Sequence, residues 1–228
     1  MKAVHRTGAR RDGRSCGEVR RLGSTDQREW RGVVSTHAFE DWSVHRGAPA
    51  EVALAVDFAN TVDQRDFGRF TPQEFLVAAG DLVGWLRDRG FAVDACSEKD
   101  FARALALRSA IREIAASHQS GVAVRGDGPD LSAALDFPLR PRLDETGAVR
   151  LRAVEDGVRG ALADIASAIV IAEAEGSWCR VKMCSAPDCR IVFYDGAKAR
   201  NSRWCATAGC GNRMKTRTYR ARRRADGA

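Results

Sequence analysis

Four cysteines near the C-terminal end of the chain have the spacing of a metal site. Cys184 and Cys189 enclose four residues, Cys205 and Cys210 enclose four more, and fifteen residues separate the two pairs. Each short loop brings two thiolates to one ion, at about 2.3 Å per Zn–S bond, and the longer gap lets the chain return to complete a tetrahedron. Four sulfurs leave no open position for water. The spacing therefore predicts one structural zinc ion that stabilises the fold and takes no part in catalysis.

A strongly basic segment follows the last cysteine. Residues 212–224 contain no proline or glycine and are dense in arginine, so we expect them to form a helix. Four arginines in this segment recur at i, i+4, i+7 and i+11 and therefore share one helical face. Such a face suits phosphate groups, whose contacts give salt-dependent affinity but little sequence information. The predicted nucleic-acid contacts are Arg203, Asn212, Arg213, Lys215, Arg217, Arg220 and Arg224.

Two of these predicted contacts have a structural alternative. Asn212 stands where an amide side chain could cap the start of the basic helix instead of touching DNA. Arg213 could make a bidentate contact to guanine in the major groove, or it could fold back and pair with Asp195. The sequence leaves both alternatives open.

The distribution of charge supports a polyanion partner at one end of the chain. Residues 177–228 hold 13 Lys and Arg against 3 Asp and Glu, a net charge of +10. Residues 47–176 hold 14 against 21, a net charge of −7, and residues 1–46 hold 10 against 6, a net charge of +4. An acidic body with a basic tail is typical of a protein that docks on nucleic acid through the tail.

The other cysteines and the hydropathy pattern point to a cytoplasmic protein. Cys16, Cys96 and Cys179 are scattered, and an odd number of cysteines with a thiolate cluster suits a reducing compartment. No run of eighteen apolar residues occurs, so we expect no membrane-spanning helix. The basic N-terminus lacks the apolar segment of a secretory signal.

Two stretches resemble a known bacterial family. Residues 193–224, FYDGAKARNSRWCATAGCGNRMKTRTYRARRR, resemble the CGNR zinc finger, and residues 54–61, LAVDFANT, resemble a signature of the ABATE domain that precedes it. The resemblance covers roughly residues 45–224. These proteins are described as stress-induced transcription regulators. The resemblance therefore implies a zinc-bound, DNA-binding C-terminus behind an N-terminal domain of another role.

Helices dominate the predicted body that must position this module. Thr71-Pro72 with Glu74 has the pattern of a capping box, so a helix is expected to begin there and to end at Gly90. A second helix begins at Ser97 and carries Arg108 at the edge of its apolar stripe. His118 lies near the end of that helix, as a capping or core residue.

The remaining elements are shorter, apart from one. We expect a helical piece over 129–135, and then a hairpin of residues 139–143 and 149–154 that exposes one basic face. The longest helix is expected over 155–175, at the centre of the body. Two short strands, 181–183 and 190–194, are expected to bracket the first cysteine pair.

A polar group interrupts the apolar stretch 51–62. In a helix Asp57, Asn60 and Thr61 would fall at i, i+3 and i+4 and share a face. That face could bind a ligand, or it could anchor a neighbouring loop by pairing with its backbone. The structural alternative is favoured because nothing else nearby converges on these residues.

Together these patterns predict an α+β protein of three parts. Residues 1–46 form a flexible basic extension, 47–176 a mainly helical domain with a small hairpin, and 177–228 a four-cysteine, zinc-ribbon-like module ending in a basic helix. The predicted function is zinc-dependent binding of double-stranded DNA by a transcription regulator, with an unknown small-molecule or protein effector on the helical domain. The alternative is a zinc-stabilised module that docks on protein or RNA. No catalytic motif is found, so no enzyme is predicted, and a symmetric dimer is one alternative for the oligomeric state.

Overall fold

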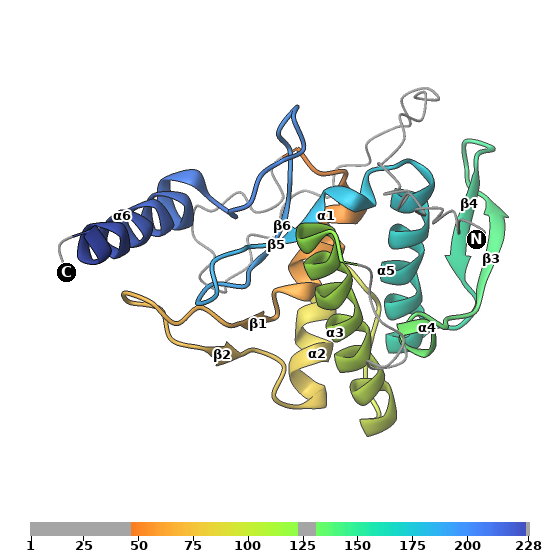
Figure 1. Cartoon of the computed structure of the whole chain (residues 1–228). Coiled ribbons are helices and arrows are strands. Elements are labelled where there is room, and N and C mark those ends of the chain that lie inside the picture. Colours follow the sequence, from red (N-terminus) through yellow and green to blue (C-terminus); the bar gives the residue numbers. More distant parts are fainter. Residues whose placement is uncertain (1–46, 123–130, 227–228) are drawn as a thin grey trace, which may run out of the picture.

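The computed structural model describes residues 47–122 and 131–226 and shows a mainly helical body with one helix, α6, extending from it (Figure 1). The strands form three separate two-stranded antiparallel sheets. The α+β prediction is therefore confirmed. The predicted extension 1–46 and the first residues of the helical piece predicted over 129–135 lie outside the described residues.

Three helices form the centre of the body. They are α1 (Ala50–Ala59), α3 (Glu98–Ser120) and α5 (Gly157–Ala174). The fully buried side chains Phe58, Ile111 and Ile165 each come from a different one of them, so the apolar stripes meet in one core. The sequence predicted that the longest helix would lie over 155–175, but the longest helix in the structure is α3, and α5 is shorter. Helix α3 runs from the cap at Ser97, whose hydroxyl accepts from the Asp100 N–H at 3.1 Å, to Gly121 in the left-handed conformation.

The predicted helix start at Thr71-Pro72 is wrong. Residues Gln73–Glu74 form strand β2, which pairs with β1 (Val62–Asp63), and helix α2 covers only Ala79–Arg87. The Glu74 carboxylate, which the capping box required, is held instead by the Arg108 guanidinium through two hydrogen bonds of 2.6 Å. The side chain of Asp81 accepts from the backbone N–H groups of Val77 and Ala78 and so begins the helix. A tertiary ion pair has overridden the local capping pattern.

The hairpin of the body follows the prediction closely. After the short helix α4 (Leu131–Ala134), strands β3 (Leu139–Leu143) and β4 (Val149–Ala153) pair along their full length. The base of β4 is tied to α5, since the Asp164 carboxylate accepts from the Ala153 N–H at 3.3 Å. The tip extends outward at the edge of the molecule (Figure 1).

The cysteine module shares the core of the body. It contains the 3-10 turn η1 (Trp178–Arg180), strands β5 (Val181–Met183) and β6 (Val192–Tyr194), the π-helical turn η2 (Thr207–Gly211) and helix α6 (Asn212–Asp226). Strands β5 and β6 are antiparallel, as predicted. Val181 and Val192 are fully buried and belong to the same apolar cluster as the helices of the body. The module is therefore packed onto the body rather than tethered beside it.

Candidate metal centre and nucleic-acid interface

The four predicted ligands come together as a metal site requires. The sulfurs of Cys184, Cys189, Cys205 and Cys210 all lie within 4.8 Å of one another. Cys189 Sγ is 3.7 Å from Cys205 Sγ, which is 3.8 Å from Cys210 Sγ. A tetrahedron with Zn–S bonds of about 2.3 Å has edges of about 3.8 Å. The cluster is therefore positioned to bind one zinc ion, and its all-thiol donor set suits a structural role.

Without a cation the four thiols cannot all ionise. Hydrogen bonding to Cys184 raises the pKa of Cys189 and of Cys205 far above the thiol range. Hydrogen bonds from Cys184 and its neighbours lower the pKa of Cys210, and Arg213 adds a further hydrogen bond to that sulfur. Buried negative charges this close repel one another, so a divalent cation is the partner that lets all four become thiolates.

Backbone hydrogen bonds hold the two cysteine loops together. Ser185 N–H donates to the Arg203 carbonyl at 2.9 Å, which links the first loop to the segment before the second. The buried Asp195 carboxylate accepts from Lys182 Nζ at 2.8 Å and from Ser202 N–H at 2.9 Å. Burial raises the pKa of Asp195, but the hydrogen bonds from Lys182 and Ser202 lower it by more. Asp195 thus fixes the exposed loop that carries Arg203.

Helix α6 starts directly on the metal cluster. Cys210 lies in the π-helical turn η2, which leads without a break into α6. Gly211 sits against Trp204, and a Cβ on it would lie 3.2 Å from the Trp204 ring. A larger residue between the last ligand and the helix would therefore require the Trp204 ring to shift by a few tenths of an ångström.

Arg213 has a structural partner, although not the predicted one. Its guanidinium forms an ion pair with Asp188, between the first two cysteines, and lies 3.6 Å from the centre of the Phe67 ring. It also donates to Cys210 Sγ at 3.6 Å. The predicted pair with Asp195 does not form because Lys182 and Ser202 already occupy that carboxylate. Arg213 therefore joins the metal cluster to the body, and its contact with DNA stays a prediction.

The rest of α6 is exposed. Met214 packs against the core, whereas Thr218 and Ala221, four and seven residues further along the helix, are exposed. No residue of this helix is buried. The remaining predicted DNA contacts on the helix are all exposed: Asn212, Lys215, Arg217, Arg220 and Arg224.

The three polar residues at the end of α1, Asp57, Asn60 and Thr61, interact with different partners. Asn60, only 2% exposed, donates from Nδ2 to the Val192 carbonyl at 2.8 Å and accepts from the Val192 N–H at 3.0 Å. Thr61 donates to the Phe58 carbonyl and lies 3.3 Å from an Arg108 nitrogen. Burial lowers the pKa of Arg89, which follows α2, and the charge of Asp57 opposes this shift. For Asn60 and Thr61 the structural alternative fits the contacts.

Arg112 links the body to the cysteine module, and the sequence analysis did not identify it. It is 7% exposed, and its guanidinium donates to the Ala59 carbonyl at 2.9 Å, to Gln64 Oε1 at 2.7 Å and to the Arg190 carbonyl at 3.0 Å. Burial lowers its pKa to about 10, so it remains charged at neutral pH. An arginine four residues after Arg108, inside an apolar stripe, was the signal available in the sequence.

Two further contacts tie the body to the module. His118 Nδ1 lies 2.9 Å from the Val181 carbonyl, in the structural role predicted for it. The Asp66 N–H donates to the Asp188 carbonyl at 2.9 Å, which places the β1–β2 segment against the first cysteine loop. Body and module are therefore joined by hydrogen bonds at several points.

Comparison with protein-family models assigns both regions of the chain. Residues 52–174 match the ABATE family, described as "Putative stress-induced transcription regulator", and this match covers more than half of the chain. The chain belongs to the ABATE family. Residues 180–223 match the CGNR zinc finger, so the resemblance read from the sequence is confirmed in the same order along the chain. A comparison with curated proteins found no match.

The ABATE match ends in the last turn of α5, and the zinc-finger match begins in η1. The family descriptions fit a zinc-binding regulator. Among the described residues, no helix has the length and apolar character needed to cross a membrane.

Proposed function

We propose that this ABATE–CGNR protein is a zinc-dependent transcription regulator that binds double-stranded DNA through helix α6. The observation that carries the proposal is the environment of α6: it begins on the metal cluster, is fixed there by Arg213, and leaves the remainder of its basic surface exposed. A rigid, positively charged helix is suited to a DNA groove and its phosphates. Arg203, exposed on the preceding loop, extends the same positive charge.

The helical domain has a separate role in this proposal. Residues 47–176 would receive the signal, a small molecule or a protein, and 177–228 would bind DNA, without catalysis in either part. The proposed division is functional, because the two parts share one apolar core. We also propose that the protein is cytoplasmic and that residues 1–46 form a basic extension of the helical domain.

The experiment is duplex-DNA binding by the zinc-loaded full chain across a salt series. We expect the variant Arg217→Ala with Arg220→Ala to lower the slope of log K against log salt by about 0.9 per lost phosphate contact, or about two units. Both residues are exposed, and the contact of Arg217 with Asp188 is a surface pair of 4.0 Å, so the fold should be unaffected. Arg213 is left intact because it positions the helix.

The control is Lys99→Ala, which removes an exposed positive charge from the first turn of α3. It should leave the slope unchanged. An unchanged slope in the α6 variant would remove that helix from the interface. Tighter binding to single-stranded RNA than to duplex DNA would favour the alternative of an RNA-docking module.

A further inference from the structure

The β3–β4 hairpin has one face made entirely of arginine. Its register places Arg140 opposite Arg152 and Arg142 opposite Arg150. Side chains alternate between the two faces of a strand, and directly opposed residues share a face, so these four lie together. The other face is apolar and consists of Leu139, Pro141, Leu143, Val149, Leu151 and Ala153.

Most of this positive charge has no counterion among the residues that the structure describes. Arg150 Nε donates to Asp144 Oδ2 at 3.1 Å. The same carboxylate also accepts from Thr146 Oγ1 at 2.6 Å and from the Ala148 N–H at 3.0 Å, so it anchors the turn as well. Within 47–122 and 131–226, no acidic side chain pairs with Arg140, Arg142 or Arg152, and all three are exposed.

Such an arrangement is unfavourable for the hairpin alone. Like charges directly opposite each other destabilise a two-stranded ribbon. The surroundings do not explain the arginines either, because 47–176 without the hairpin 139–153 holds 10 Lys and Arg against 19 Asp and Glu. A cluster of unpaired arginines on an otherwise acidic domain indicates an external anion.

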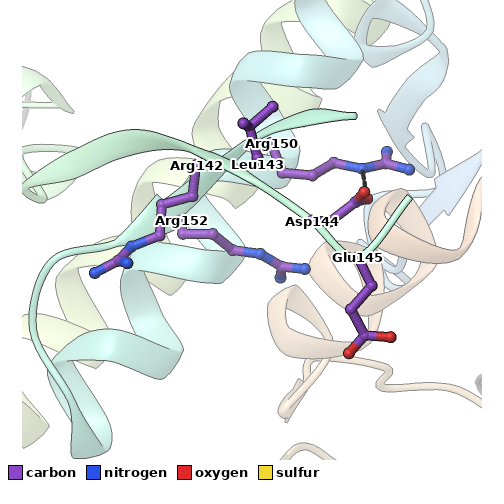
Figure 2. Close-up of a pocket in the computed structure, with 6 residues that line it drawn as sticks. All are labelled: Arg142, Leu143, Asp144, Glu145, Arg150 and Arg152. Carbon is purple, nitrogen blue, oxygen red and sulfur yellow. Dashed lines mark hydrogen bonds and ion pairs between the residues drawn. The ribbon is translucent and has the colours of Figure 1, made fainter. Parts of the chain in front are cut away.

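The shape of the surface is open. Arg142 and Arg152 extend from the two strands (Figure 2), and with Asp144 and Glu145 they line a hollow of about 280 Å³ at the turn. The Glu145 carboxylate points away from the Arg142 guanidinium in this view (Figure 2).

The composition of the two faces identifies the kind of anion. The core of a protein–protein interface combines arginine with aromatic and other apolar residues, whereas this face has arginine alone. A membrane surface would require basic and apolar residues on the same side, and here Leu143 and Val149 lie on the opposite face. A phosphodiester backbone needs only spaced guanidinium groups, which bind phosphate through two parallel hydrogen bonds.

We propose that the β3–β4 ribbon binds the phosphate backbone of duplex DNA through Arg140, Arg142 and Arg152. This inference rests on the proposed function, in which DNA is the partner of the chain. The ribbon and α6 lie at opposite ends of the molecule (Figure 1), so they contact separate segments of duplex. One protein would then hold two duplex segments together.

The experiment compares the zinc-loaded full chain with the variant Arg140→Gln, Arg142→Gln, Arg152→Gln. We expect the salt slope of duplex binding to fall by about 0.9 for each lost contact, or about 2–3 units. The melting temperature should stay equal or rise, because like charges are removed from an exposed ribbon. Energy transfer between two differently labelled duplexes should appear with the wild type and vanish with this variant.

The control is Leu143→Gln with Val149→Gln, which changes the apolar tip and keeps every arginine. Both side chains are exposed, at 72% and 70%, so the hairpin should fold and both readouts should match the wild type. An equal loss of slope in the control would overturn the inference, because the hairpin as a whole and not its arginines would be responsible.

The failures of the two proposals differ. If the wild type shows no salt-dependent binding to duplex DNA, both proposals are overturned. If the wild type binds, the α6 variant loses slope and the ribbon variant does not, only the ribbon proposal is overturned. Binding of the ribbon to vesicles of anionic lipid, with an unchanged DNA slope, would assign it to membranes instead.

Discussion

Asn60 offers the sharpest test of how the body holds the metal module. Its side chain is 2% exposed and makes both hydrogen bonds of the Val192 peptide groups, at 2.8 and 3.0 Å. In Asn60→Ala the N–H and the C=O of the fully buried Val192 lose these partners. A buried polar group left without a partner costs about 1–3 kcal/mol, so the two together predict a loss of about 2–6 kcal/mol in the free energy of unfolding.

The assay is urea unfolding of the full chain with saturating zinc, in which the loss of helix is monitored by far-UV circular dichroism. In thermal unfolding of a protein of this size, each kcal/mol lost from the free energy of unfolding lowers the melting temperature by about 2–4 °C. A loss near 3 kcal/mol therefore predicts a decrease of about 6–12 °C. Zinc release to a chelator should also be faster, because Val192 lies three residues after the ligand Cys189.

Two further variants define the controls. Asn60→Asp keeps an acceptor for the Val192 N–H but places a buried carboxylate against the Val192 carbonyl, so it should destabilise more than alanine does. Asn201→Ala alters an exposed asparagine and should change the free energy by less than about 0.5 kcal/mol. If Asn60→Ala also stays within about 0.5 kcal/mol of the wild type, the reasoning about buried partners is wrong.

Two other predictions concern the metal and an ion pair. Cys205→Ser should lose the zinc ion and shift the unfolding of the whole chain in a single transition, because module and body share a core; a body that melts at the wild-type temperature would contradict this. For Glu74, burial raises the pKa, but hydrogen bonds from Arg108 lower it below its ordinary 4.5. Stability from this pair is therefore present above pH 4.5 and is lost as the pH falls below it. In urea titrations the difference in free energy of unfolding between the wild type and Glu74→Gln should become smaller below pH 4.5. A difference that does not change with pH would show that the ion pair with Arg108 is not its cause.

The shared core also changes which experiments are informative. A chain cut at residue 177 would expose the buried side chains that α1 and α3 pack against β5 and β6, so loss of DNA binding on truncation could reflect misfolding. Point substitutions on exposed arginines of α6 and of the β3–β4 ribbon avoid this. They separate the charge of a surface from the stability of the domain beneath it.

The sequence alone determined the features that depend on local spacing. Two C-x4-C loops fix four thiols within the span of one tetrahedral ion, so the ligand set followed from counting residues. The cap at Ser97, the hairpin over 139–153 and the basic helix after Asn212 are likewise set by neighbouring residues. Alternation along residues 149–153 also predicted a basic face on the hairpin, although not that arginines of the two strands stand opposite one another.

Tertiary structure decided the partners of the buried polar residues. Glu74 had a choice between capping a helix and pairing with Arg108, thirty-four residues away, and a buried guanidinium outweighs a local cap. Arg213 paired with Asp188 because Asp195 was already bound to Lys182. Asn60 meets Val192 across 132 residues of chain, a contact that no local pattern encodes. The spacing of neighbours determined where the metal binds, whereas long-range satisfaction of buried polar groups determined how the module is held.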